Sequence, residues 1–114
     1  MALIYKIVTS DVWQGAQAAG QLTGMPVDLA DGYIHFSSAS QLRETAARHF
    51  AGQAGLVLLG VEADRLGTAL TWEPSRGGAL FPHLYAPLAT DLVSLAVPLP
   101  MNAAGAHLFP EGIP

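Results

Sequence analysis

The apolar run at residues 56–63, LVLLGVEA, limits the folds open to this chain more than any other segment. The run is short for a helix, but a strand that is covered on both of its faces has this continuous apolar pattern. We therefore predict a strand here, at the centre of a sheet.

Further strand patterns lie on both sides of this run. Residues 3–8, LIYKIV, alternate so that one face of the expected strand carries Leu3, Tyr5 and Ile7. Later segments with strand-like patterns are DGYIHFS at 31–37, TALTWEP at 68–74, LFPHLYAPL at 80–88 and DLVSLAVPLP at 91–100. Because the prolines in LFPHLYAPL lack an N–H donor, we expect that segment at a sheet edge, at a bulge or in an extended loop.

Two helices are predicted between the early strands. The first covers two to three turns within residues 10–20 and ends before the turn signals TGMP at 23–26. The second begins at Ser38 and Gln41, which have the spacing of a capping box, and its apolar positions then recur every four residues up to residue 50.

The order of these elements predicts the fold class. Strand, helix, strand and helix are followed by three or four strands with no convincing helix between them, which favours the α+β class over a doubly wound parallel sheet. The 114 residues fit one domain, 1–114, in which residues 101–114 form an extended C-terminal tail rich in Gly and Pro. We expect two small mixed or antiparallel sheets and two helices.

Composition excludes several classes of function. The formal net charge is -4 and no cluster of Lys or Arg is present, so duplex nucleic acid is not an expected partner. The chain has no cysteine, which excludes thiol catalysis and disulfides. It has no apolar run long enough for a membrane span and no secretory signal, so we expect a cytoplasmic protein that does not bind membranes. Only 12% of the residues are charged, which favours a surface partly buried in a homodimer.

Polar chemistry is concentrated in three segments, YIHFSS, TWEPSRGG and FPHLY. They supply His35, Ser37, Glu73, Arg76, His83 and Tyr85. Most other acids, including Asp28 and Asp31, have the pattern of turn or helix-surface residues.

Each of these candidates has a structural and a functional interpretation. His35 shares a strand face with Tyr33 and Ser37, so this polar row either lines a pocket or bonds to neighbouring groups within the sheet. Glu73 is either a solvated carboxylate paired with Arg76 or a group that activates a ligand hydroxyl.

Two other types of site fit the sequence poorly. His35, His83 and Glu73 could form a two-histidine, one-carboxylate metal site, but they lack the short spacing that preorganises metal ligands on one element. A hydrolase based on Ser37 would need a nucleophile elbow, and Ser37 instead follows Phe36 in an ordinary strand pattern. We therefore predict no metal site.

The segments IYKI, GYIHFSSASQL, WEPSRGG and FPHLY together resemble a bacterial family catalogued as domain of unknown function nine-five-two, and the resemblance extends to about Leu95. That family is similar to the ADP-ribosyltransferase-like superfamily, whose members bind NAD between two small sheets that are roughly perpendicular. The resemblance implies NAD or ADP-ribose as a substrate rather than a resident cofactor. It places Tyr5, His35 and Ser37 at the ligand cleft and makes Glu73 the candidate for a late-strand glutamate that acts on a ribose. Lys6 stands where the superfamily pattern has a histidine that grips the NAD ribose.

Two hypotheses follow. In the first, the protein is a transferase of the ADP-ribosyl or 2'-phosphotransferase type that acts on NAD or a related ribosyl or phosphate ligand. Its catalytic residues would be Glu73 and His35, and its ligand-binding residues Ser37, Arg76, His83, Tyr85 and Tyr5. In the second, the same cleft belongs to a non-catalytic module that binds a small ligand or a protein.

Overall fold

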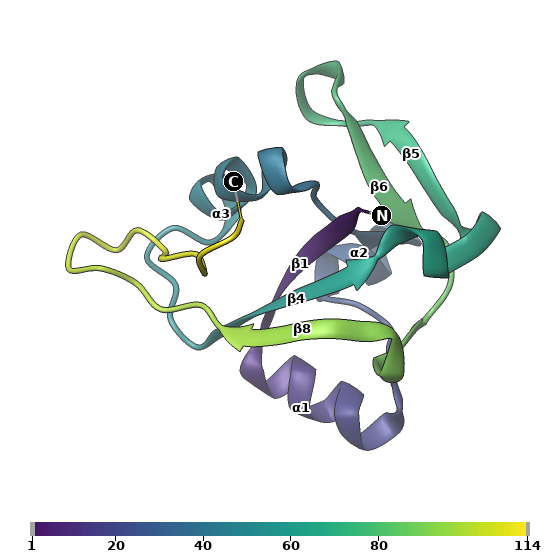
Figure 1. Cartoon of the computed structure of the whole chain (residues 1–114), viewed down its shortest axis with the longest axis horizontal. Coiled ribbons are helices and arrows are strands. Elements are labelled where there is room, and N and C mark those ends of the chain that lie inside the picture. The colour runs from purple at the N-terminus through teal and green to yellow at the C-terminus, as the bar shows by residue number, and fades with distance from the viewer. Residues whose placement is uncertain (1, 114) are drawn as a thin grey trace.

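The centre of the computed structural model, which describes residues 2–113 except for the side chain of Arg76, is a three-stranded antiparallel sheet. It consists of β1 (Leu3–Thr9), β4 (Leu56–Glu62) and β8 (Val93–Pro98), in the order β1-β4-β8 (Figure 1). The sequence prediction that residues 56–63 form a central strand is thus confirmed. Two of the side chains of β4, Leu58 and Leu59, are fully buried and belong to different core clusters.

Two helices cover this sheet on opposite faces. The alternation in β1 sends Ile4 and Val8 into one core cluster with Ala16 of α1 (Ser10–Ala19). It sends Tyr5 and Ile7 into the other cluster with side chains of α3 (Ala39–His49). Ser38 and Gln41 form the predicted capping box at the start of α3.

A second antiparallel sheet has the order β3-β6-β5. It contains β3 (Ile34–His35), β5 (Leu70–Pro74) and β6 (Leu80–Leu84), with β5 and β6 forming a hairpin that extends beyond the central sheet (Figure 1). The expectation that Pro82 restricts its segment to an edge, a bulge or a loop is wrong, because β6 is the middle strand. The carbonyl of Pro82 still accepts the N–H of Phe36 at 3.0 Å, so the proline lacks only the hydrogen bond that its own N–H would make to β3.

Pro82 also explains why β3 is short. The register pairs His35 with His83, so the next residue, Phe36, faces Pro82, which has no N–H to return a second hydrogen bond. The chain then changes partner, and Ser37 exchanges two backbone hydrogen bonds of 2.8 Å with Tyr5 of the central sheet. This exchange joins the two sheets.

The third helix, α2 (Pro26–Asp31), was not predicted, because the turn signals TGMP overlap its start. Pro26 occupies its first turn, where a missing N–H is tolerated, and Gly32 ends the helix with a φ of 87°. The sequence therefore underestimated the helices by one, and it also missed the small pair β2 (Gln21–Leu22) and β7 (Leu88–Ala89).

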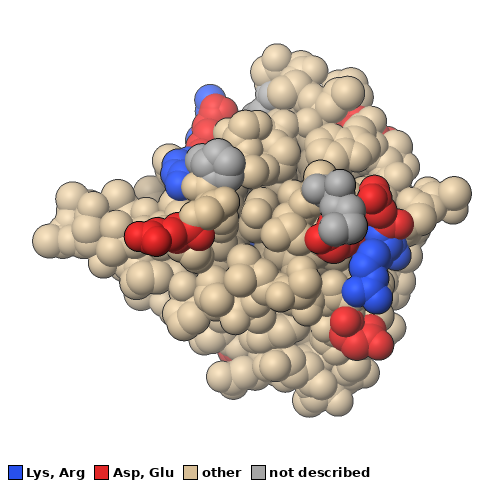
Figure 2. Space-filling view, in the orientation of Figure 1, with Lys and Arg blue, Asp and Glu red and all other residues tan. Residues whose placement is uncertain are grey.

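Short 3-10 turns complete the chain at Ala63–Ala69, Arg76–Gly78 and Thr90–Leu92. The C-terminal segment runs beside α3, and the carbonyl of Ile113 accepts a hydrogen bond of 2.9 Å from Arg43 (Figure 1). Within residues 2–113, no helix has the length and apolar character needed to span a membrane. On the face shown in Figure 2, the acidic and basic residues form small separate groups on a largely uncharged surface.

Candidate functional site

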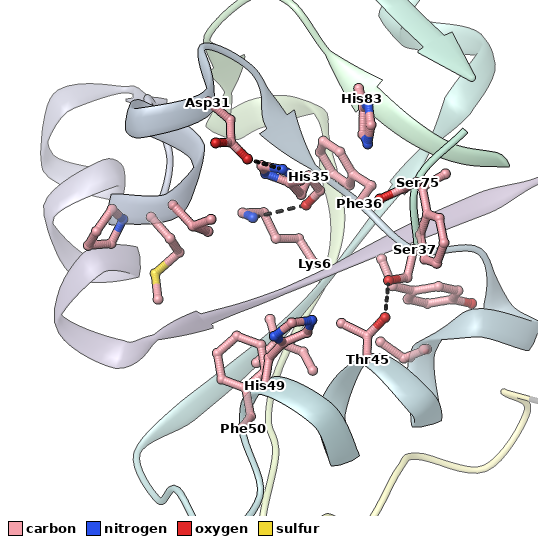
Figure 3. Close-up of a pocket in the computed structure, with 17 residues that line it drawn as sticks. Lys6, Asp31, His35, Phe36, Ser37, Thr45, His49, Phe50, Ser75 and His83 are labelled. Carbon is pink, nitrogen blue, oxygen red and sulfur yellow. Dashed lines mark hydrogen bonds and ion pairs between the residues drawn. The ribbon is translucent and has the colours of Figure 1, made fainter. Parts of the chain in front are cut away.

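A cavity of about 550 Å³ lies where β1, α2, β3, α3 and β6 meet (Figure 3). Its volume is within the range of small-molecule sites, and its wall is mostly apolar with a few polar side chains. Lys6, His35, Ser37 and His83 all line it. We call this cavity the main pocket.

A buried ion pair joins Lys6, which lines the main pocket, to Asp28, which does not line it. Lys6 Nζ lies 2.8 Å from Asp28 Oδ2, and both side chains are at least 95% buried. The same ammonium donates to the backbone carbonyl of His35 at 2.9 Å. Burial lowers the pKa of Lys6, although the charge of Asp28 opposes that effect.

Asp28 is the centre of this network rather than a surface residue, so the sequence interpretation of it was wrong. Its carboxylate accepts the backbone N–H groups of Met25 at 2.6 Å and His35 at 3.0 Å, and it binds His35 Nδ1 at 2.6 Å. Burial alone would raise the pKa of Asp28, but the hydrogen bonds from His35 and the charge of Lys6 outweigh it and lower that pKa to about 2.

His35 bonds a carboxylate at each ring nitrogen. Nδ1 bonds Asp28, and Nε2 lies 3.0 Å from Asp31 Oδ2 (Figure 3). A neutral imidazole has only one N–H, so two ionised carboxylates are both satisfied only by the doubly protonated, positively charged ring.

A second histidine, His83, is held by one carboxylate. Its Nδ1 lies 2.8 Å from Glu73 Oε1, and Tyr85 donates its hydroxyl to the same oxygen at 2.7 Å. The hydrogen bonds from Tyr85 and then from His83 lower the pKa of Glu73, and the carboxylate raises the pKa of Tyr85 to about 12. Glu73 is therefore ionised at neutral pH, and the proton of this pair belongs on His83 Nδ1.

The other nitrogen of His83 is unusual. The side chain is 97% buried, and among the described residues Nε2 has no hydrogen-bond partner. Buried polar atoms without a partner are rare in folded proteins. His83 lines the main pocket and its ring points toward it (Figure 3), so the buried Nε2 lies at the pocket wall.

Tyr33 joins the two histidines. Its ring is stacked on His83 at 4.2 Å and tilted against His35 at 4.5 Å, measured between ring centroids, while Tyr85 lies 5.1 Å away. Burial, followed by the charges of Asp31 and Glu73, raises the pKa of Tyr33. The cluster holds His35 and His83 within 5.3 Å of each other.

The structure brings together most of the residues singled out from sequence, at different depths. Tyr5, His35, Ser37 and His83 line the main pocket, and Ser37 Oγ bonds Thr45 of α3 at 2.8 Å. Glu73 and Tyr85 do not line it but lie behind His83.

The remaining differences concern Arg76, which was predicted to bind a ligand, and the buried pair of Lys6 and Asp28. The side chain of Arg76 lies outside the described residues. The contribution of Asp28 and its pairing with Lys6 were missed. The signal for them was weak: a lysine inside an apolar strand pattern and an aspartate two residues after Pro26.

No group of three His, Asp or Glu side chains in residues 2–113 has an arrangement that could hold a metal ion.

Comparison with known proteins gives the family and no activity. A family model described as "Protein of unknown function (DUF952)" matches residues 7–96. The crystal structure of protein CC0527 from Caulobacter crescentus is similar, with a TM-score of 0.90 and 53% sequence identity over 93% of each chain. The solution NMR structure of CC0527 has a TM-score of 0.83 and 54% identity, over 92% of this chain and 90% of that one. No curated protein matches. The family expected from GYIHFS and FPHLY is thus confirmed, and the chain belongs to the DUF952 family.

Proposed function

We propose that the main pocket takes a small ligand with a free hydroxyl group and that His83 acts as a general base toward that hydroxyl. One observation carries the proposal: the buried, unpartnered Nε2 of a histidine whose other nitrogen is fixed by a carboxylate. Such a pair has the two properties that a histidine base needs, a defined tautomer and a free nitrogen.

The proposed proton transfer is simple. Glu73 keeps the hydrogen on Nδ1, so the neutral ring presents a lone pair at Nε2. The ligand hydroxyl gives its proton to Nε2, and the imidazolium that results is stabilised by the ionised Glu73. In this reaction Glu73 positions the base and does not touch the ligand, which differs from the role expected for it at a ribose.

The resemblance to ADP-ribosyltransferases suggests which ligand to test. Tyr5, His35 and Ser37 line one pocket, which supports a ribosyl or phosphate ligand there. Lys6 is committed to Asp28, which argues against the usual pose of intact NAD. We therefore propose phosphoryl transfer from a 2'-phosphorylated nucleotide to the ligand hydroxyl. The oxygen that His83 deprotonates forms a bond to phosphorus, the bond from phosphorus to the nucleotide 2'-oxygen breaks, and that 2'-oxygen takes the proton back from His83 Nε2. ADP-ribose would bind in the same pocket as an acceptor or a product, and both ligands are preferred to NAD.

A second candidate function is a binding module without turnover. One observation favours it: the polar groups near the pocket already contact one another. Asp28 contacts Lys6 and His35, and Asp31 contacts the other ring nitrogen of His35. In that case His83 Nε2 would accept a hydrogen bond from the ligand and move no proton.

The test combines calorimetry with product detection. NAD, ADP-ribose and a nucleoside 2'-phosphate are titrated into the wild-type protein, and released nicotinamide, inorganic phosphate and modified acceptor are measured. The variants are His83→Gln, Glu73→Gln and the control His107→Gln, which changes a half-buried histidine that bonds the carbonyl of Gln53 and does not line the pocket.

We expect Glu73→Gln to bind as wild type does but to react about 100-fold to 10,000-fold more slowly, because glutamine no longer fixes the tautomer. His107→Gln should behave as wild type. Turnover that survives His83→Gln would exclude the base, and saturable binding without turnover would establish the binding module. Failure of every probe to bind would refute the ribosyl and phosphate ligand class.

A further inference from the structure

The two carboxylates on His35 differ in how firmly they are held. Asp28 is completely buried and its carboxylate is tied to two backbone N–H groups, Lys6 and His35. The side chain of Asp31 is 45% exposed, and its contact with His35 Nε2 is 3.0 Å long. Exposed ion pairs of this kind contribute little stability.

The backbone around Asp31 also allows its side chain to move. Asp31 is the last residue of the six-residue helix α2, and Gly32 follows it with a left-handed φ of 87°. A rotation of the Asp31 side chain would break no buried contact of Asp28. Asp31 can therefore leave His35 while the rest of the network stays intact.

The contacts of the network place an anion at this position. If both nitrogens of His35 are protonated, Lys6 and His35 carry two positive charges, of which the buried Asp28 balances one. The charge that remains is balanced by Asp31 at the Nε2 end of His35, on the wall of the main pocket (Figure 3). The Lys6 ammonium has three N–H groups, of which Asp28 and the carbonyl of His35 take two.

We propose that the Nε2 end of His35 is a subsite for the phosphate or carboxylate group of a ligand, and that Asp31 is an internal carboxylate that occupies this subsite until the ligand displaces it. Lys6 lines the same pocket. Asp31 thus lowers the affinity for any anionic ligand and blocks the subsite in its absence. The inference rests on the proposed function only in taking the main pocket as the ligand site, and it requires no turnover.

The experiment measures binding of inorganic phosphate and ribose 5-phosphate by calorimetry, with ribose as the uncharged comparison. Asp31→Asn is compared with Asp91→Asn, which changes the net charge equally at an exposed acid outside the pocket. Asp31→Asn should bind the two phosphates about fivefold to tenfold more tightly than wild type, because the competing carboxylate and its repulsion are removed. Asp91→Asn should change the affinity by less than about twofold, since its charge is distant and screened.

A second readout uses the wild-type protein and needs no variant. In carboxyl-carbon and imidazole-nitrogen NMR spectra, added phosphate should shift the signals of Asp31 and of His35 Nε2 and leave the Asp28 carboxyl signal in place. Equal affinities in Asp31→Asn and Asp91→Asn, or phosphate titration without movement of the Asp31 signal, would overturn the proposal. If His83→Gln leaves turnover unchanged while Asp31→Asn binds phosphate more tightly, the general base is refuted and the subsite stands. If His83→Gln abolishes turnover while Asp31→Asn binds phosphate as Asp91→Asn does, the subsite alone is refuted.

Discussion

Replacing Asp28 with asparagine tests the buried network most directly. Asparagine keeps the shape of the side chain but removes the charge that balances Lys6, which is 95% buried. Its amide nitrogen would also face groups that are donors themselves, since Asp28 accepts from Met25, His35 and Lys6. We expect the Lys6 charge to be left without compensation in the protein interior.

The cost follows from the burial of both partners. Removing one member of a buried pair costs about 3–5 kcal/mol of unfolding free energy. A domain of this length has a total of roughly 6–17 kcal/mol, at about 0.05–0.15 kcal/mol per residue. Asp28→Asn should therefore still fold, with a clearly lower urea midpoint in tryptophan fluorescence.

A double-mutant cycle separates the interaction energy between Lys6 and Asp28 from other destabilising effects of the two substitutions. Lys6→Met combined with Asp28→Asn removes both charges, so the double variant should be about 2–3 kcal/mol more stable than the sum of the single effects implies. A loss below about 1 kcal/mol in Asp28→Asn, or simple additivity in the double variant, would refute the view that Lys6 and Asp28 depend on each other.

The pH dependence of the unfolding free energy provides an independent measure of the contribution of Asp28. The pKa of Asp28 is lowered from 3.8 to about 2 in the folded protein, so its stabilising effect is complete above pH 4 and is lost as the pH falls through the folded value. The shift corresponds to about 2 kcal/mol. The difference in unfolding free energy between wild type and Asp28→Asn should shrink by about that amount between pH 6 and pH 2; a constant difference would contradict the assigned pKa.

Two further substitutions test the hydrogen bond between Tyr85 and Glu73 and the close packing of β8 against Gly60 of β4. Tyr85→Phe removes the main donor to Glu73, so the pKa of Glu73 should rise toward its usual value in a carboxyl-carbon NMR titration, and an unchanged pKa would place the cause elsewhere. Gly60→Ala would set a Cβ only 3.0 Å from the Cβ of Leu95 and should cost about 1–3 kcal/mol in urea unfolding. Gly15→Ala is its control: it meets nothing within 4 Å in α1 and should stabilise the protein by about 0.5–1 kcal/mol.

The fold was predictable where one local signal dominated. The apolar run at 56–63 fits a covered strand better than a short helix, and Ser38 with Gln41 could form a cap without any tertiary contact. The helix α2 was missed because its first turn, which contains Pro26, has the composition of a turn. Its stability comes from a tertiary contact, the hydrogen bonds between Asp28 and His35, which no local pattern reveals.

The site was predictable in its residue types and not in its pairings. A polar row in YIHFSS indicated a pocket wall, and His35 and Ser37 do line the pocket. That Glu73 orients His83, however, depends on the register of the β5–β6 hairpin, which the sequence leaves open. Asp28, the partner of Lys6, lies in the helix α2, which was not predicted. The sequence pattern alone therefore does not explain why Lys6 is buried.

The missing N–H of Pro82 determines where the main pocket lies. Because Pro82 has no N–H to offer Phe36, the pairing of β3 with β6 ends with the single hydrogen bond from the Phe36 N–H to Pro82, and the chain then pairs Ser37 with Tyr5. Consecutive residues of one short segment thus belong to two different sheets, which must diverge at that point. The main pocket lies along this divergence, and His35 and Ser37 line it because they stand on either side of the change of partner. A proline whose segment was expected at a sheet edge, at a bulge or in an extended loop therefore places the two polar residues that the sequence analysis singles out first.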